Sequence, residues 1–220
     1  MNDDELIKAL SATGKSRVTL YLSPAKVESV YLQSVAQVTE LVRSGKHGGK
    51  LSGSLLGFLG AEVAAEGALE AKVAMTPLLQ AIAAEKAAEQ AGPLIDLTRQ
   101  APTQGRLMRY IGPARFHLTT PPAESEKPPI SQAAWDIISQ RRLVQEEIIR
   151  WKNKDAKTVV LAFTQGPMVF ASIASSESLN ENLFASYFRE PVVGILCRME
   201  GAAQQAVTFL DPIWIWHEAP

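Results

Sequence analysis

The chain has 220 residues, of which 46% are hydrophobic and 20% are charged, and its formal net charge is −1. This composition is typical of a folded globular protein and excludes a disordered chain. The near-neutral charge argues against general nucleic-acid binding, which needs many lysines and arginines to displace the counterions of the phosphates.

The single cysteine, Cys197, excludes an intramolecular disulfide and favours a reducing compartment. The first residues, "MNDDELIKAL", are acidic and lack the apolar run of a secretory signal. The longest uncharged apolar segment, residues 51–61, is shorter than the ~18 residues that span a bilayer. We therefore expect a cytoplasmic protein without a transmembrane segment.

The first element in chain order is a short strand over residues 18–22, and a helix follows it. Ser23 can cap this helix, and Pro24 suits its first turn because proline lacks the amide proton that has no partner there. Gly45 ends the helix. Apolar residues recur on one face at helical spacing: Val27, Val30, Tyr31, Val38, Leu41 and Val42.

The next segment, "SGKHGGKLSGSLLGFLG" at residues 44–60, is rich in glycine. It fails the phosphate-loop pattern, because Ser44 stands where the first glycine belongs and Leu51 where the metal-binding hydroxyl belongs. We expect a mobile loop at residues 45–50 that leads into an ordered apolar segment at residues 51–58. A loop that contacts a membrane or a partner is the alternative.

Residues 61–75 combine two opposed signals. Glutamates alternate with apolar residues, which favours a strand, whereas the alanines favour a helix. Gly67 would weaken a helix interior, so a strand is preferred. A helix then begins at Thr76 and Pro77 and ends before Gly92 and Pro93.

The second half predicts most of the sheet. Residues 105–120 form a strand pair or a bent strand, broken at Gly112 and Pro113. Residues 130–155 form a long helix with two apolar stripes, so we expect it to be packed on two sides. A short helix, "SLNENLFASYF", lies among four further strands: "TVVLAFT", "MVFASIA", "PVVGILCRM" and "AVTFLDPIWIW".

The fold class predicted from these elements is α+β. N-terminal helices accompany a small mixed sheet that comes mainly from the C-terminal third. The proline-rich stretch at residues 119–129 is the predicted linker between a helix-rich region at 1–118 and a region at 130–220 that holds the long helix and the sheet. The two regions could also form one domain.

The patterns that mark catalysis or metal binding are missing. His47, His117 and His217 are far apart and have no further ligand at metal-binding spacing. Cys197 lies in an apolar strand, which favours a core position over a nucleophile. The carboxylate pairs Asp3-Asp4 and Glu146-Glu147 lack the apolar surroundings that would raise a pKa for acid catalysis. No catalytic, cofactor-binding or metal-binding residue is therefore assigned, and no cofactor is expected.

One candidate face combines basic and aromatic residues, a mixture that suits nucleotides or single-stranded nucleic acid. A solvated strand face is the commoner explanation of such a pattern. The face comprises Arg106, Arg109, Tyr110, Arg115 and Phe116, and Lys46 and Lys50 could extend it.

A second candidate is the C-terminal segment "DPIWIWHEAP". Trp214 and Trp216 fall on one side of a strand, and Ile213 and Ile215 fall on the other. Such a strand is either central in the core or covered by a partner, because both of its faces are apolar. The tryptophan pair is therefore a candidate partner surface, with core packing as the commoner explanation.

Three features resemble a family of uncharacterised bacterial proteins: the strand and helix "YLSPAKVESVYLQS", the variable glycine-rich stretch after it, and the final strand "DPIWIW". About a third of the chain carries the resemblance. Members of that family look like accessory or sensor proteins in bacterial defence neighbourhoods, with no established activity to carry over. The resemblance implies a bacterial source and leaves the alanine-rich region at 61–91 unmatched.

These observations lead to two hypotheses of function. The first is a non-catalytic regulatory or interaction protein of a bacterial stress or phage-defence system, with a protein partner or self-association. The alternative is a module that binds nucleotide or single-stranded nucleic acid through the basic and aromatic face.

Overall fold

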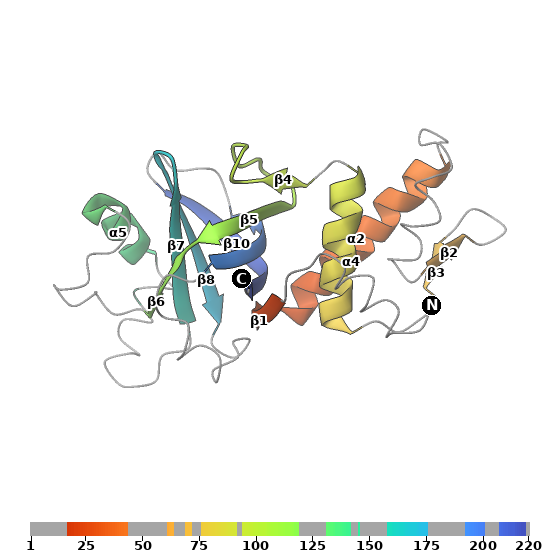
Figure 1. The fold of residues 1–220 in the computed structure, drawn as a ribbon, viewed down its shortest axis with the longest axis horizontal. Coiled ribbons are helices and arrows are strands. Elements are labelled where there is room, and N and C mark those ends of the chain that lie inside the picture. Colours follow the sequence, from red (N-terminus) through yellow and green to blue (C-terminus); the bar gives the residue numbers. More distant parts are fainter. Residues whose placement is uncertain are drawn as a thin grey trace. The chain divides into compact units, whose positions relative to one another are not determined.

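The structure is a computed structural model, and it divides into two compact units (Figure 1). One unit holds Leu22–Leu94, and the other holds Arg17–Tyr21 with Ile95–Ala219. The chain has the expected α+β architecture, with most of the sheet in its C-terminal part. The structure describes residues 17–43, 61–63, 69–71, 76–91, 94–118, 131–141, 145, 158–175, 192–200 and 207–218.

The first unit contains the helix predicted after Ser23, α2 (Pro24–Arg43). The helix begins as expected, with the amide of Val27 donating to the carbonyl of Ser23 at 2.9 Å. Its buried face matches the predicted spacing. The buried side chains of this face are Val27, Val30, Tyr31, Ser34 and Val38.

The second helix of this unit, α4 (Pro77–Ala91), packs against α2. Thr76 precedes it and accepts a 3.4 Å hydrogen bond from the amide of Leu79, which starts the first turn. Alanines fill most of the buried positions of α4, and such small side chains let two helix backbones approach closely. The buried alanines are Ala81, Ala83, Ala84, Ala87 and Ala88.

In the ambiguous segment at residues 61–75, the described residues form two short strands. β2 (Ala61–Val63) and β3 (Leu69–Ala71) pair in antiparallel fashion, with Glu62 opposite Glu70. The alternating pattern therefore prevailed over the helix propensity of the alanines, which is consistent with the cost of Gly67 in a helix interior.

The second unit is built on one mixed sheet, in the order β4-β5-β9-β10-β8-β7-β6, and β1 also pairs with β10. The pairs β4–β5 and β10–β8 are parallel, whereas β5–β9, β9–β10, β7–β8 and β6–β7 are antiparallel. The strands are β1 (Arg17–Leu22), β4 (Ile95–Asp96), β5 (Met108–Pro113), β6 (Arg115–Leu118), β7 (Thr158–Gln165), β8 (Met168–Ser175), β9 (Val192–Met199) and β10 (Val207–Glu218).

The longest strand, β10, organises this sheet. Its first part, Val207 to Leu210, pairs with β8 on one side, while β9 pairs along the other side. Because β8 occupies that first part, β1 must use the rest of the same edge. The register shifts between Pro212 and Trp214, where proline has no amide proton for the ladder.

The sheet curls so strongly that strands far apart in its order come into contact. Three strands separate β5 from β7, yet the rings of Tyr110 and Phe163 stack with their centroids 3.8 Å apart. The side-chain amide of Gln165, the last residue of β7, also donates to the carbonyl of Thr98, just after β4, at 2.8 Å. The inner face of the curl therefore encloses a core, to which β1, β5, β7, β8, β9 and β10 all contribute.

The outer face carries a second core under the helix α5 (Gln132–Ser139). Ser131 caps this helix by accepting from the amide of Ala134 at 3.2 Å, and Trp135 and Ile138 are buried against the sheet. The helix predicted for residues 130–155 is interrupted after Ser139, where α5 ends; Gln145 is helical again, with its amide donating to the carbonyl of Arg141 at 2.9 Å, and most of the remaining residues of this prediction fall outside the described part. Just after α5, Arg141 turns its guanidinium over the ring of Phe209, 4.3 Å from the centroid.

Several sequence expectations fall on residues outside the described ones. They include the glycine-rich stretch 44–60, the linker 119–129 and the helix "SLNENLFASYF". The strands on either side of the predicted linker, β6 and β7, pair in one sheet. The division into compact units instead falls between Leu94 and Ile95.

Candidate binding surface in the loop between β4 and β5

Buried apolar side chains fill the inner face of the curled sheet. Tyr110, Phe163 and Phe170 form a continuous stack across its middle. Cys197 lies in the same core, where burial, and secondarily the charge of Asp211, raises the pKa of its thiol far above its usual range. The thiol is therefore protonated at physiological pH, which agrees with the predicted core role.

Polar groups gather instead in the loop between β4 and β5. β4 has two residues, and they pair with the first two residues of β5 in parallel fashion. Because both strands run in the same direction, residues 97–107 must carry the chain back to the start of β5. Gly105 makes this return possible with a φ of +73°, a conformation that disfavours other residues. We call the exposed side chains of this loop, Arg99, Gln100, Thr103, Gln104 and Arg106, the β4–β5 loop surface.

The start of the loop is held by hydrogen bonds around Asp96. Its Oδ1 accepts from the amide of Thr98 at 2.9 Å and from the Thr98 hydroxyl at 2.6 Å. The carbonyl of Asp96 accepts from the amides of Arg99 and Gln100. Gln165, from the end of β7, holds the same turn through the carbonyl of Thr98.

The charges around Asp96 are mostly positive. Burial alone would raise the pKa of the Asp96 carboxyl, but the hydrogen bonds from Thr98 and the charges of Arg109 and Arg99 outweigh burial and lower it. Asp96 therefore stays ionised at neutral pH. Arg106 adds a further positive charge at the other end of the loop, so three arginines accompany one carboxylate.

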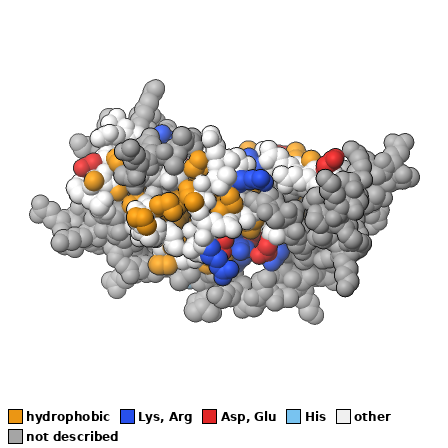
Figure 2. All heavy atoms as spheres, turned by 90° about the horizontal axis from the view of Figure 1, so that it is seen from above, with side chains coloured by type: hydrophobic (Ala, Val, Ile, Leu, Met, Phe, Trp, Pro, Cys, Tyr) orange, Lys and Arg blue, Asp and Glu red, His pale blue; other side chains and the backbone are white. Residues whose placement is uncertain are grey.

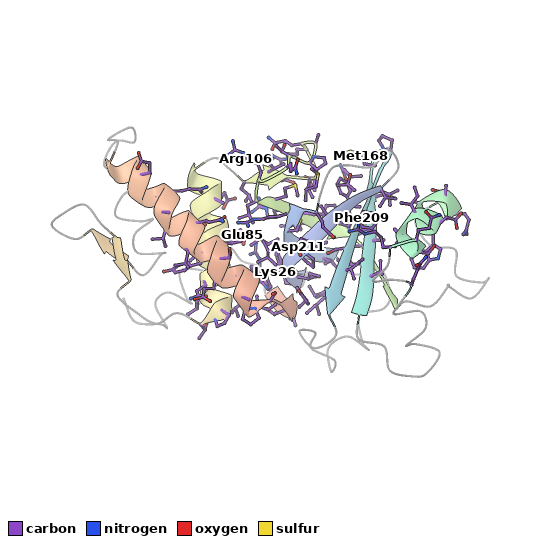
Figure 3. The ribbon with its side chains drawn as sticks, turned by 180° about the vertical axis from the view of Figure 1, so that it is seen from behind. Lys26, Glu85, Arg106, Met168, Phe209 and Asp211 are labelled. Atoms are coloured by element: carbon purple, nitrogen blue, oxygen red, sulfur yellow. The ribbon has the colours of Figure 1, made fainter. Side chains whose placement is uncertain are left out.

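Figure 3 labels Arg106 in the β4–β5 loop and Met168 at the turn between β7 and β8, both toward the upper end of the view. Figure 2 looks down on the molecule from above. Basic side chains of the described residues are visible on this face, and acidic side chains lie beside some of them.

The predicted basic and aromatic face is only partly present. Arg106 is exposed and Arg109 is half-buried, but Tyr110 is only 2% exposed. The Tyr110 hydroxyl donates to the carbonyl of Pro113 at 2.8 Å, and its ring is covered by Phe163. Tyr110 is thus unavailable for stacking on a base. Arg115 and Phe116 lie in β6, and their side chains, like Lys46 and Lys50, fall outside the described part.

The candidate partner surface at the C-terminal strand is in the core. Trp214 and Trp216 are 1% and 0% exposed, and their ring centroids lie 4.2 Å apart. The Trp214 indole donates to the Thr19 hydroxyl at 3.1 Å, and the Arg17 guanidinium lies over both rings. This cluster connects β1 to β10. Because both rings are buried, they are not part of an exposed surface that a partner could contact.

Asp96, Thr98, Arg99 and Gln165 were not singled out from the sequence. A signal was present for Asp96 and Thr98, because an Asp side chain commonly bonds the backbone two residues on in an Asx turn. Gln165 had no such signal, since its partner Thr98 is 67 residues away in sequence.

No protein-family model matches the chain, and neither a curated protein nor a solved structure is significantly similar to it. Within the described residues, no three or more His, Cys, Asp or Glu side chains are grouped in a way that could hold a metal ion. None of the helices in that part combines the length and the apolarity needed to cross a membrane.

Proposed function

We propose that the protein is a non-catalytic interaction protein that recognises its partner through the β4–β5 loop surface. The observation that carries this proposal is the contrast between the sheet and one of its loops. The inner face of the sheet is packed with apolar side chains and the outer face carries a second apolar core, whereas charged and hydrogen-bonding groups gather in the loop between β4 and β5. Loops placed by a rigid sheet commonly carry recognition in proteins.

The loop is suited to recognition because it is already ordered. Hydrogen bonds at Asp96, Thr98 and Gln165 fix its first turn, and a bond from the Arg106 amide to the Thr103 carbonyl at 3.3 Å fixes its second. A preformed loop loses less conformational freedom on binding than a flexible one, which favours affinity.

The setting that we propose for this interaction is a bacterial stress or phage-defence system. The resemblance of "YLSPAKVESVYLQS" and "DPIWIW" to uncharacterised bacterial proteins motivates it.

The test uses the full chain as immobilised bait in extract from a bacterial host. We expect a protein to be retained in stoichiometric amount, and to cross-link to residues 96–109. The purified chain is screened in parallel for hydrolase and transferase activity. A turnover abolished by one substitution, or retention of no protein at all, would overturn the proposal.

The alternative, a nucleotide or single-stranded nucleic-acid module, is less well supported by the geometry. Among the described residues, the large hydrophobics that are exposed are Leu32 and Leu78, and neither is aromatic. Binding of single strands usually uses aromatic side chains as stacking platforms. Thermal shift with oligonucleotides and cyclic nucleotides at low salt tests it, and a clear stabilisation that Arg109→Ala reduces would restore it.

A further inference from the structure

We infer that the β4–β5 loop surface binds a carboxylate-rich segment of a partner protein, with Arg99 and Arg106 as the contact residues. The inference rests on the proposed function and names the chemistry of its partner. It starts from charge: Arg99 and Arg106 are both exposed, and Arg109 lies next to Asp96 across the β4–β5 pair.

Residues 96–109 carry one carboxylate and three arginines. The charges of Arg109 and Arg99 act on Asp96, whose Oδ1 also accepts two hydrogen bonds from Thr98. Arg106 lies three residues before Arg109, which is roughly 10 Å along an extended chain. The loop therefore keeps an excess of positive charge within about one Debye length at physiological salt.

The chemistry of arginine selects the ligand group. A guanidinium presents a planar fork of donors that matches a carboxylate with two parallel hydrogen bonds. Two such forks, held on an ordered loop, suit a segment with two or more acidic side chains. Steering by the positive loop would also speed the encounter with an acidic partner.

A nucleic acid is the less favoured polyanion for the same surface. The one aromatic residue of the expected face whose side chain is described, Tyr110, is buried under Phe163. Carboxylates need no stacking platform, so the loop meets their requirements without one.

The test measures fluorescence anisotropy of the full chain with a labelled peptide of alternating glutamate and glycine. A peptide of alternating glutamine and glycine is the uncharged control, and oligothymidylate of equal charge is the phosphate control. The variant is Arg99→Gln/Arg106→Gln. Its matched control, Ser29→Glu/Gln37→Glu, makes the same change in net charge at exposed positions of α2, in the other unit.

We expect the acidic peptide to bind the wild-type chain. The arginine variant should raise the Kd of the peptide by about tenfold, and the α2 control should change this Kd by less than about twofold. Equal weakening in both variants, absence of peptide binding, or tighter binding of oligothymidylate than of the peptide would overturn the inference. Melting temperatures of the variants confirm that they are folded.

The same variants separate this inference from the proposed function. If the Arg99→Gln/Arg106→Gln bait retains a partner as well as the wild-type bait does, the arginine contact is refuted and the interaction role is kept. Retention of no partner, with peptide binding intact, would refute the interaction role as proposed and keep the carboxylate preference of the loop.

Discussion

Gly194 shows how one residue position can limit the packing of the sheet. It lies in β9 opposite Trp216 of β10, and the Trp216 indole lies flat against its backbone. A Cβ at this position would overlap the indole ring, which is itself fully buried.

Gly194→Ala should therefore destabilise the protein by about 1–3 kcal/mol, the usual cost of overpacking a core. Chemical denaturation of the full chain measures this. Gly105→Ala is the comparison, because a Cβ there meets open space and costs only the left-handed backbone, about 1 kcal/mol. A smaller loss at Gly194 than at Gly105 would contradict the packing described.

Asp96 is the residue whose charge should make stability depend on pH. Its pKa in the folded chain is lowered, so its contribution is present above the pKa of the unfolded chain, about 4, and is lost as pH falls through the lower folded value. Asp96→Asn should therefore reduce the free energy of unfolding at pH 7, and wild type and variant should converge below about pH 4. A difference that grows as the solution is acidified would show that the sign is wrong.

The alternation of side chains along a strand separates Arg109 from Tyr110, and the predicted basic and aromatic face did not take this alternation into account. In a strand, successive side chains point to opposite faces, so Met108 and Tyr110 must share one face and Arg109 must lie on the other. Where basic and aromatic residues alternate in a half-buried strand, the basic side chains therefore lie on one face and the aromatic side chains on the other. That alternation explains why Tyr110 is in the core while Arg109 lies outside it.

At the scale of elements, α5 shows how a short helix is held by its buried face. Its capping residue, Ser131, starts it, and Ile138 is 0% exposed against the outer face of the sheet. Its neighbour Ile137 is only partly buried. These adjacent isoleucines provide a matched pair for testing the placement of the helix.

Ile138→Ala should cost about 2–4 kcal/mol of unfolding free energy, because it removes a buried side chain and leaves a cavity. Ile137→Ala should cost less than about 1.5 kcal/mol, since that side chain is already partly in water. Urea denaturation of both variants decides the matter. Equal losses, or a larger loss at Ile137, would mean that α5 is rotated from the position described.

Element positions were largely predictable, whereas element ends were less so. Runs of β-branched residues marked β7, β8, β9 and β10, and a proline after a serine or threonine marked the start of α2 and of α4. The end of α5 was missed, because helical periodicity continues past Ser139. A tertiary contact, Arg141 with Phe209 and Glu200, accompanies the break.

At the scale of the sheet-bearing unit, the curl of the sheet is the feature that no local pattern could predict. It brings β5 against β7, and the residues that meet there, Tyr110 and Phe163, are far apart in sequence. Strand order depends on such non-local pairings, and sequence periodicity carries no information about which strands pair. The curl is also what places the β4–β5 loop next to the end of β7.

A double-mutant cycle tests the curl. Tyr110→Leu and Phe163→Leu should show a coupling energy of about 0.5–1.5 kcal/mol, as expected for stacked rings in contact. Tyr110→Leu with Phe209→Leu is the control, because Phe209 belongs to the core on the outer face. Coupling in the control pair and none in the stacked pair would contradict the arrangement.

The central claim is that this protein acts through the β4–β5 loop surface while the interior of its sheet is only a core. Titration of the ¹⁵N-labelled full chain with the glutamate–glycine peptide, followed by amide chemical shifts, tests it most directly. We expect progressive shifts within residues 96–109 and at Gln165, which is bonded to Thr98. Shifts confined to the inner-face residues Ile195 and Ile215, or to α2 and α4, would contradict it.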